Sequence, residues 1–419
     1  MNVRKIPLLA WIGAAIVLGI LLGPIMPIWL GNIFITYNSL FSGFLGFAVP
    51  LIILGLVLPA IAELGKGAGK FLGITAGIAY TSTILAGLLT FVASIAILTP
   101  ALKDTELKVL SEGGGSGLEP YFTLVSSPTG NATEIVLPPL MPVMTALVIA
   151  LVLGLGLTAF KNSTSLKVAQ EFRSIIEVLI RKVIVPALPL FIFGIFLDLS
   201  KSGDAIKVVS TFMIVVVLSF VLTAVVLVLQ YTVAGAIAGV NPFKALWNMR
   251  DAYATALGTS SSAATIPVTL ESTKKNGVSN AVAGFVVPLC ATIHLSGSMV
   301  KITCFSIAVM LVGGTSVSFT SFLPFILMLG VMMIAAPGVP GGAIAAAAGL
   351  LTQMLGFGDM EIGLMFATYI ALDSFGTATN VTGDGAIALI MNKFAKDQHL
   401  GDTPTEAEFA AADENPVNA

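Results

Sequence analysis

Ala371-Leu-Asp-Ser-Phe-Gly-Thr-Ala-Thr-Asn-Val-Thr-Gly-Asp384 is a polar stretch within a long hydrophobic segment near the C-terminus. It contains two carboxylates, Asp373 and Asp384, and the amide Asn380. On an α-helix of about 3.6 residues per turn, these three side chains fall on one face. A charge near the centre of a bilayer costs roughly 2.5–3.5 kcal/mol on insertion scales, so intramembrane carboxylates usually serve a function. The stripe therefore indicates a binding site for a cation or for a solute with an amino group; a structural contact between helices is the alternative.

The composition places the chain in a lipid bilayer. Of its 419 residues, 56% are hydrophobic and 10% are charged, whereas soluble domains carry about 25% charged residues. We therefore expect a protein that crosses the membrane several times, and we exclude a soluble one. The net charge of −2 and the lack of a large basic cluster give no reason to expect a nucleic-acid partner.

Long apolar windows in the first part of the chain predict six helices. Several windows exceed the ~20 residues that span a bilayer, which implies tilt or extension beyond it. Arg4 and Lys5 precede the first window, but its length favours a retained helix over a cleaved signal peptide. The windows are residues 6–30, 33–63, 69–99, 136–160, 174–200 and 206–240.

The distribution of lysine and arginine predicts the orientation in the membrane. It places both termini in the cytoplasm and the long polar loop 100–135 outside, although Lys201 and Lys207 fall on the wrong side. The expected location is the plasma membrane. The polar, acidic segment 397–419 is expected to be a disordered cytoplasmic tail.

Small polar residues, glycine and proline interrupt the apolar runs of the second half. Two interruptions, Gly258–Pro267 and Ala335–Gly342, each lie midway in such a run. Irregular backbone at membrane depth is tolerated only where protein buries it or where it lines a cavity. Paired broken segments are typical of a transporter's substrate site. We therefore expect two re-entrant helical hairpins with tips near the middle of the membrane.

The two expected tips offer groups suited to an anion and to a hinge. Ser260, Ser261 and Ser262 present hydroxyls, and a half-helix that begins there favours a carboxylate. A helix–helix contact through small polar residues is the alternative. The cluster Gly338–Gly342 fits a second tip with a hinge, although a simple kink has the same sequence signature.

His294 and Lys301 are the titratable residues of an apolar segment that also contains Cys290 and Cys304. We predict one continuous helix here, in which the two cysteines lie about 21 Å apart, too far for a disulfide. Lys301 either reaches an interface or pairs with an acid of the polar stripe. His294 alone is more often a hydrogen-bonded helix contact than a ligand. The sequence has no Walker-type loop and no nucleophile–base arrangement, so we expect neither an ATP-driven pump nor an enzyme.

The second half of the chain resembles the glutamate transporter family, also called the dicarboxylate/amino acid:cation symporters, as a divergent member. Four segments follow the order and spacing of that family. The six apolar windows agree with the family in number and length only. The four segments are Ser260–Pro267, Pro288–Ser298, Pro337–Gly342 and Asn380–Asp384.

The resemblance implies an all-α membrane protein with eight transmembrane helices and two re-entrant hairpins, assembled as a homotrimer. A transport domain would cross the membrane past a fixed scaffold like an elevator, with the second hairpin as a gate. The scaffold would comprise residues 1–68 (helices one and two) and 136–205 (helices four and five). The transport domain would comprise 69–99 (helix three) and 206–396 (helix six, both hairpins, helices seven and eight), with 100–135 as an extracellular loop.

The resemblance also implies a role for individual residues. Asp373, assisted by Asn380, would bind the substrate's amino group, while Ser262 and the backbone near Val339 would bind its α-carboxylate. Asp384 and Asn380 would ligate sodium. The implied substrate-binding set is Ser261, Ser262, Ser298, Val339, Pro340, Gly341, Asp373, Thr377 and Asn380, and the implied metal-binding set is Thr81, Ser82, Cys290, His294, Asn380 and Asp384.

Three departures from the family pattern modify these expectations. Members that carry acidic substrates have an arginine at the position of Gly376 or of Ser260, and a buried second carboxylate without a cation is disfavoured. The family's Asn-Met-Asp-Gly-Thr is His294-Leu-Ser-Gly-Ser298 here, so one sodium site loses its charge. Lys301 adds a positive charge to the same segment.

These departures predict a secondary-active symporter that moves a small neutral amino acid with sodium. Fewer sodium ions would be coupled, with Lys301 or His294 standing in for one, and proton coupling through His294 is an alternative. A dicarboxylate or acidic amino acid is the alternative substrate, with Lys301 or Arg250 as the missing cation. An uncoupled facilitator is the alternative class of protein, and uptake driven by an ion gradient separates it from a symporter.

Overall fold

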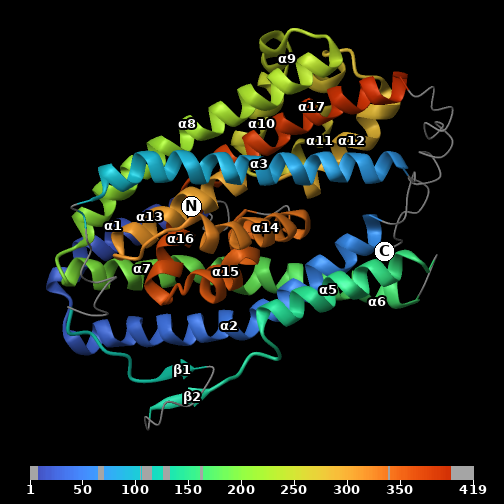
Figure 1. The fold of residues 1–419 in the computed structure, drawn as a ribbon. Helices are drawn as coiled ribbons and strands as arrows, with labels where there is room; N and C mark the ends of the chain where they lie inside the picture. The colour runs from blue at the N-terminus through green and yellow to red at the C-terminus, as the bar shows by residue number, and fades with distance from the viewer. Residues whose placement is uncertain are drawn as a thin grey trace, which may run out of the picture.

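The computed structural model describes residues 8–64, 70–103, 105, 116–125, 133–160, 164–337 and 340–397. They form an elongated bundle in which long helices run side by side across the molecule (Figure 1). The expected cytoplasmic tail lies outside the described residues beyond Asp397.

The six apolar windows each contain a helix, as predicted. A 3₁₀ turn, η2 (Gly23–Ile25), follows the first helix, and a π-helical turn, η3 (Ile180–Ile184), joins α6 to α7 without a break. The helices are α1 (Leu8–Leu22), α2 (Ile28–Leu64), α3 (Lys70–Ala101), α5 (Val143–Thr158), α6 (Thr164–Leu179), α7 (Val185–Lys201) and α8 (Ala205–Ala238).

Six helical segments of the described chain are long and apolar enough to cross a membrane. Several are longer than a simple span requires, as predicted: α2 has 37 residues and α8 has 34. By contrast, α5 has only 16 residues. The six segments are Leu8–Ile25, Ile28–Glu63, Lys70–Ala101, Thr164–Lys201, Ala205–Ala238 and Asn280–Val312.

Shorter helices make up the second half, and they end where the polar interruptions were predicted. Ser260 has a left-handed backbone with φ of 49° and separates α10 from α11, and the next interruption separates α14 from α15. Each of these pairs packs together as a helical hairpin. The helices are α9 (Pro242–Asn248), α10 (Arg250–Thr259), α11 (Ser262–Lys274), α12 (Asn280–Ile293), α13 (Ser296–Val312), α14 (Phe319–Ala335), α15 (Gly342–Leu355), α16 (Asp359–Ala371) and α17 (Asp373–Asp397).

The expectation of an all-α fold is wrong in one detail. Two strands, β1 (Thr123–Val125) and β2 (Glu134–Val136), pair in parallel within the segment expected to be loop, with Leu124 opposite Ile135. Both strands contain β-branched residues, which suit a pleated, half-buried surface. β1 contacts α2, and β2 lies on the far side of β1 (Figure 1).

The prediction of one continuous helix through Cys290 and Lys301 is also wrong. The chain leaves the helical conformation at His294, where φ is −115° and ψ is 92°, and α13 begins two residues later. Since Gly297 lies in the first turn of α13, its N–H has no partner in its own helix and bonds to α17 instead. Both cysteines are free and buried.

The last helix occupies the position that matters most for function. It contacts α8, α10, α12 and α13. In Figure 1, α2, α5 and α6 lie along the lower side, α3, α8 and α17 along the upper side, and α13 to α16 between them. Because neighbours cover α17 on several sides, its polar side chains are removed from the surface.

Candidate functional site

The polar stripe lies on a single helix, as predicted. Helix α17 begins at Asp373, and Asn380 and Asp384 follow along it. The exposed fractions of the three residues are 7%, 4% and 0%. Each of the three side chains reaches a place where another helix begins or ends. The stripe therefore joins two breaks in the second half of the chain, the one between α12 and α13 and the one between α14 and α15.

Asp373 connects α17 to the tip between α14 and α15. Its Oδ2 accepts a hydrogen bond from the N–H of Gly341 over 2.8 Å. Gly341 has φ of 74°, a conformation that glycine adopts without strain, and it precedes the first residue of α15. Backbone N–H groups at a helix start lack partners in the helix and attract carboxylates. The second hairpin is thus held against α17 by a carboxylate.

Asn380 connects α17 to the start of α13. Its Oδ1 accepts from the N–H of Gly297 over 2.8 Å, and its Nδ2 donates to Oγ of Ser298 over 3.3 Å. The two helices touch here through their backbones: a Cβ on Gly297 would lie 2.6 Å from the carbonyl oxygen of Gly376. Only glycine fits such a contact, so Gly297 sets the distance between α13 and α17.

Asp384 connects α17 to the end of α12. Its Oδ1 lies 3.0 Å from Nδ1 of His294, and both side chains have an exposed fraction of 0%. The other ring nitrogen of His294 lies 3.1 Å from Oγ of Ser82 and 3.4 Å from Nε2 of Gln230. A buried histidine thus links α17 to α3 and α8.

The surroundings of Asp384 fit the cation that the resemblance implies. Its Oδ2 is buried and has no hydrogen-bond partner among the described residues, and the same is true of Oε1 of Gln230. A Cβ on Gly383 would lie 2.8 Å from that Gln230 oxygen, which places the amide beside the Asp384 turn. Unpaired buried oxygens are costly. Sodium, a hard cation that prefers oxygen ligands, would satisfy them.

The other expected metal ligands differ from one another in burial and in contacts. Ser82 faces His294, while Thr81 is exposed and lines a groove beside α3. Cys290 is buried, and its carbonyl accepts the N–H of His294 over 2.9 Å.

Lys301 reaches the junction between α16 and α17. Its Nζ donates to the carbonyl oxygens of Leu372, over 3.0 Å, and Asp373, over 3.4 Å, and lies 3.9 Å from Oδ1 of Asp373. The ammonium also lies 4.3 Å from the ring centre of Tyr369, a cation–π distance. Of the two sequence-based alternatives for Lys301, the structure supports pairing with an acid of the stripe.

The first hairpin supplies the remaining expected residues. Oγ of Ser261 caps α11 by accepting the N–H of Ala264 over 3.3 Å, and Ser262 is buried. Helix α10 packs on α17 in a cluster that contains Ala256 and Ala378. Thr377 is buried and donates to the carbonyl of Asp373.

The second hairpin's tip is described in part. Pro340 is exposed and Gly341 is buried, whereas Val339 lies outside the described residues. Ser298 is buried, and its hydroxyl lies 2.9 Å from that of Tyr369. Asp373, Gly341, Ser298 and Asn380 thus form one connected group with Lys301.

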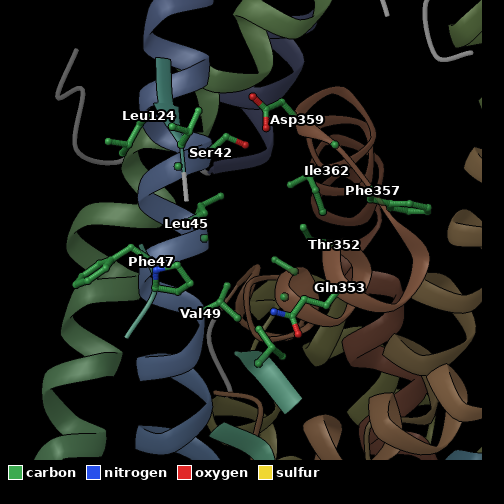
Figure 2. A pocket seen from close by; sticks show the side chains of 18 of the residues that line it. Ser42, Leu45, Phe47, Val49, Leu124, Thr352, Gln353, Phe357, Asp359 and Ile362 are labelled. Atoms are coloured by element: carbon green, nitrogen blue, oxygen red, sulfur yellow. The ribbon is translucent and has the colours of Figure 1, made fainter. Parts of the chain in front are cut away.

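Two cavities adjoin these elements. One, of about 540 Å³, lies between α2 and the helices α15 and α16, whose side chains face each other across it (Figure 2). Its polar lining includes Ser42, Gln353 and Asp359, and it contains none of the expected site residues. The other is a groove of about 740 Å³ between α3, α8 and α17, and Thr81, Ser82 and Gln230 line it.

Two site residues were missed from the sequence. Gln230 is a polar residue in the middle of the apolar helix α8, which is a recognisable signal of an intramembrane polar contact. Tyr369 carries no such signal, because a buried tyrosine in an apolar helix is ordinary. Its role follows only from its place beside Ser298 and Lys301.

Broken apolar helices around a buried polar stripe define a membrane transport protein. The chain belongs to the sodium:dicarboxylate symporter family, which its residues 8–394 match. The neutral amino acid transporter B(0) of Mus musculus is 27% identical over 155 residues, which cover 37% of this chain and 28% of that protein. The excitatory amino acid transporter of Caenorhabditis elegans is 27% identical over 265 residues, which cover 61% of this chain and 52% of that protein.

The chain thus spans about half or less of the length of these curated relatives. The match confirms the family resemblance seen in the second half and extends it across most of the chain. The family and these relatives are transporters rather than enzymes.

Proposed function

We propose that the chain is a secondary-active symporter that moves a small neutral amino acid together with sodium. The buried stripe of α17 carries this proposal, because each of its polar groups meets a helix break that contributes further polar groups. In the proposal, Asp373 binds the substrate's ammonium group. Asp384, with its unpartnered Oδ2, and Asn380 bind the cation.

The surroundings of Gly376 support a neutral substrate. A Cβ at this position would overlap Nζ and Cε of Lys301, so a longer side chain such as arginine does not fit while the lysine stays in place. The lysine itself is directed at the carbonyls of Leu372 and Asp373. A second substrate carboxylate would therefore find no free cation here and would be costly to bury. The relatives' names include both neutral and excitatory amino acids, and the surroundings of Gly376 are the reason that we propose a neutral substrate.

The contacts of the His294 ring support the proposal that fewer sodium ions are coupled. It takes one oxygen of Asp384 and leaves only the other for a cation. Ser296, at the position of the family's acid, contributes a neutral hydroxyl that accepts from Gln230 over 3.1 Å. In the proposal, the ion site at Asp384 thus keeps one free carboxylate oxygen, whereas the site at Ser296 has no charged ligand.

The proposal includes an elevator mechanism with eight transmembrane helices and two re-entrant hairpins, α10–α11 and α14–α15. Residues 1–68 and 136–205 form the scaffold, and residues 69–99 and 206–396 move. The assembly is a homotrimer in the plasma membrane with cytoplasmic termini. The hydrogen bond between Gly341 and Asp373 supports a gate at the second hairpin, because a ligand ammonium at Asp373 would change the same contact.

Uptake into liposomes tests the proposal. Purified protein is reconstituted, and radiolabelled serine, threonine, alanine and aspartate are offered under an imposed sodium gradient, an imposed proton gradient or neither. We expect a neutral amino acid to accumulate above its external concentration only with the sodium gradient. Accumulation driven by the proton gradient alone would indicate proton coupling, and equilibration without accumulation would indicate a facilitator. Preference for aspartate would refute neutral specificity.

A further inference from the structure

Lys301 is a charged side chain that is almost completely buried. Its exposed fraction is 1%, and it is among the largest fully buried side chains of the described residues. The packing of α13 against neighbouring helices does not require an ammonium group at this depth, and an unpaired charge there is strongly disfavoured. The groups that contact the Lys301 ammonium therefore indicate its role.

The ammonium has a full set of partners in the protein itself. It donates to the carbonyls of Leu372 and Asp373, lies 3.9 Å from the Asp373 carboxylate, and rests on the ring of Tyr369. A lysine ammonium has three N–H donors, so little capacity remains for an anionic ligand. Lys301 is thus placed as a partner of Asp373 rather than as a receptor for a substrate carboxylate.

The missing side chain of Gly376 makes this placement possible. The space that a Cβ would fill at this position is taken by Nζ and Cε of the lysine. Glycine at 376 and lysine at 301 therefore act as one unit, in which the ammonium reaches the first turn of α17 from the neighbouring helix.

The net charge of Lys301 and Asp373 together affects how readily the transport domain crosses the membrane. With Lys301 and Asp373 both charged, the pair is neutral when no substrate is bound. An amino acid zwitterion adds no net charge, so the unit is also neutral when it is loaded. Without the lysine, the Asp373 carboxylate of the empty carrier would have no cation in the protein and would need one from solution, whereas in the loaded carrier the substrate's ammonium group would pair with it.

We propose that Lys301 is the built-in counter-ion of the empty carrier, which neutralises Asp373 so that the transport domain returns without substrate and without a cation bound at this carboxylate. The inference rests on the proposed function and adds the return step to it. The separation of 3.9 Å is an ion pair without a short hydrogen bond. The substrate ammonium can therefore approach Asp373 while Lys301 keeps its two carbonyl partners.

The first test uses the wild-type protein. Net uptake of radiolabelled serine over many turnovers requires return of the empty carrier, whereas exchange of external for internal serine does not. We expect net uptake to be unchanged, within twofold, when the vesicles contain only the large cation N-methyl-D-glucamine instead of small monovalent cations. A tenfold or greater loss of net uptake in these vesicles would overturn the proposal.

The second test uses Lys301→Met, with Lys207→Met as the control. Lys207 is an exposed lysine paired with Asp204 at the start of α8, so its variant should behave as the wild type. For Lys301→Met we expect the ratio of net uptake to exchange to be at least tenfold lower than in the wild type. Methylammonium inside the vesicles should restore part of the net uptake, because it replaces the tethered ammonium.

The outcomes separate the two proposals. If the wild type neither exchanges nor accumulates serine, threonine or alanine, the proposed function fails and the counter-ion role fails with it. If the wild type transports but Lys301→Met slows exchange and net uptake by the same factor, with no response to methylammonium, Lys301 is only a structural link between α13 and α16. If the variant cannot be purified folded, the wild-type test with N-methyl-D-glucamine decides.

Discussion

Replacing Gly376 with alanine should destabilise the protein through a residue that is not its neighbour in sequence. The added methyl group would overlap Nζ and Cε of Lys301. Gly376 and Lys301 are both buried, so the lysine side chain cannot swing into water. It must give up its 3.0 Å bond to the carbonyl of Leu372 and move away from Asp373.

The expected loss in the free energy of unfolding is the sum of three effects. Overpacking a core by one methyl group costs about 1–3 kcal/mol, and loss of a hydrogen bond to a charged group costs about 1.5–3 kcal/mol. Alanine in place of glycine within a helix returns about 1 kcal/mol. The free energy of unfolding of Gly376→Ala should therefore fall by roughly 1.5–5 kcal/mol.

Thermal melting in detergent measures this loss. Scaling from smaller domains, the melting temperature of a chain of this length shifts by about 1–2 °C per kcal/mol, so we expect a drop of roughly 1.5–10 °C. Gly284→Ala is the matched control, because Gly284 lies within α12 and a Cβ there meets nothing within 4 Å. That variant should melt at or slightly above the wild type.

Making Gly376→Ala in a variant of Lys301 as well as in the wild type isolates the contact between these two residues. In Lys301→Ala both overlapping atoms, Nζ and Cε, are absent, so Gly376→Ala should cost at least 1 kcal/mol less there than in the wild type, about the coupling expected of residues in contact. The reasoning is refuted if Gly376→Ala melts at or above the wild type. It is also refuted if its penalty is the same in both backgrounds.

Three further predictions concern neighbouring contacts. Gly297→Ala should lower the melting temperature by more than Gly376→Ala does, since its Cβ would lie 2.6 Å from a rigid backbone carbonyl rather than against a side chain; equal or higher stability would contradict the close packing of α13 on α17. The double variant His294→Asn with Ser296→Asp should increase the sodium dependence of uptake, because it frees Oδ1 of Asp384 and restores a charge, and an unchanged sodium titration would count against the assignment of this region. Ser260→Val should cost about 1–2 kcal/mol while Ser260→Gly is tolerated, because only the former is strained at φ of 49°; equal melting temperatures of the two variants would argue against the left-handed turn.

Local sequence patterns predicted a large part of the fold and of the site. The spacing of Asp373, Asn380 and Asp384 was sufficient to place them on one helical face, because helix periodicity is a local property. The breaks near Ser260 and Gly341 were predicted for the same reason, since serine, glycine and proline clusters end apolar helices.

Contacts between distant segments could not be predicted in this way. The pairing of His294 with Asp384 spans 90 residues, and the fit of Lys301 against Gly376 depends on how closely α13 and α17 pack. The break at His294 was not predicted and the segment was expected to be one continuous helix, because nothing in the local sequence shows that Gly297 donates its N–H to α17. The strands β1 and β2 were missed because three-residue segments carry too little periodicity to detect.

The recognition of an ammonium group by Asp373 is tested most directly by equilibrium binding to the purified protein. Calorimetry compares the neutral amino acid that binds most tightly, serine for example, with the analogue in which a hydroxyl replaces the amino group, glycerate in that case. We expect the wild type to bind the amino acid and to bind the analogue at least a hundredfold more weakly, and Asp373→Asn to lose this preference. Equal affinity of the wild type for the two compounds, or a preference that survives in Asp373→Asn, would contradict the assignment of Asp373 as the substrate's partner.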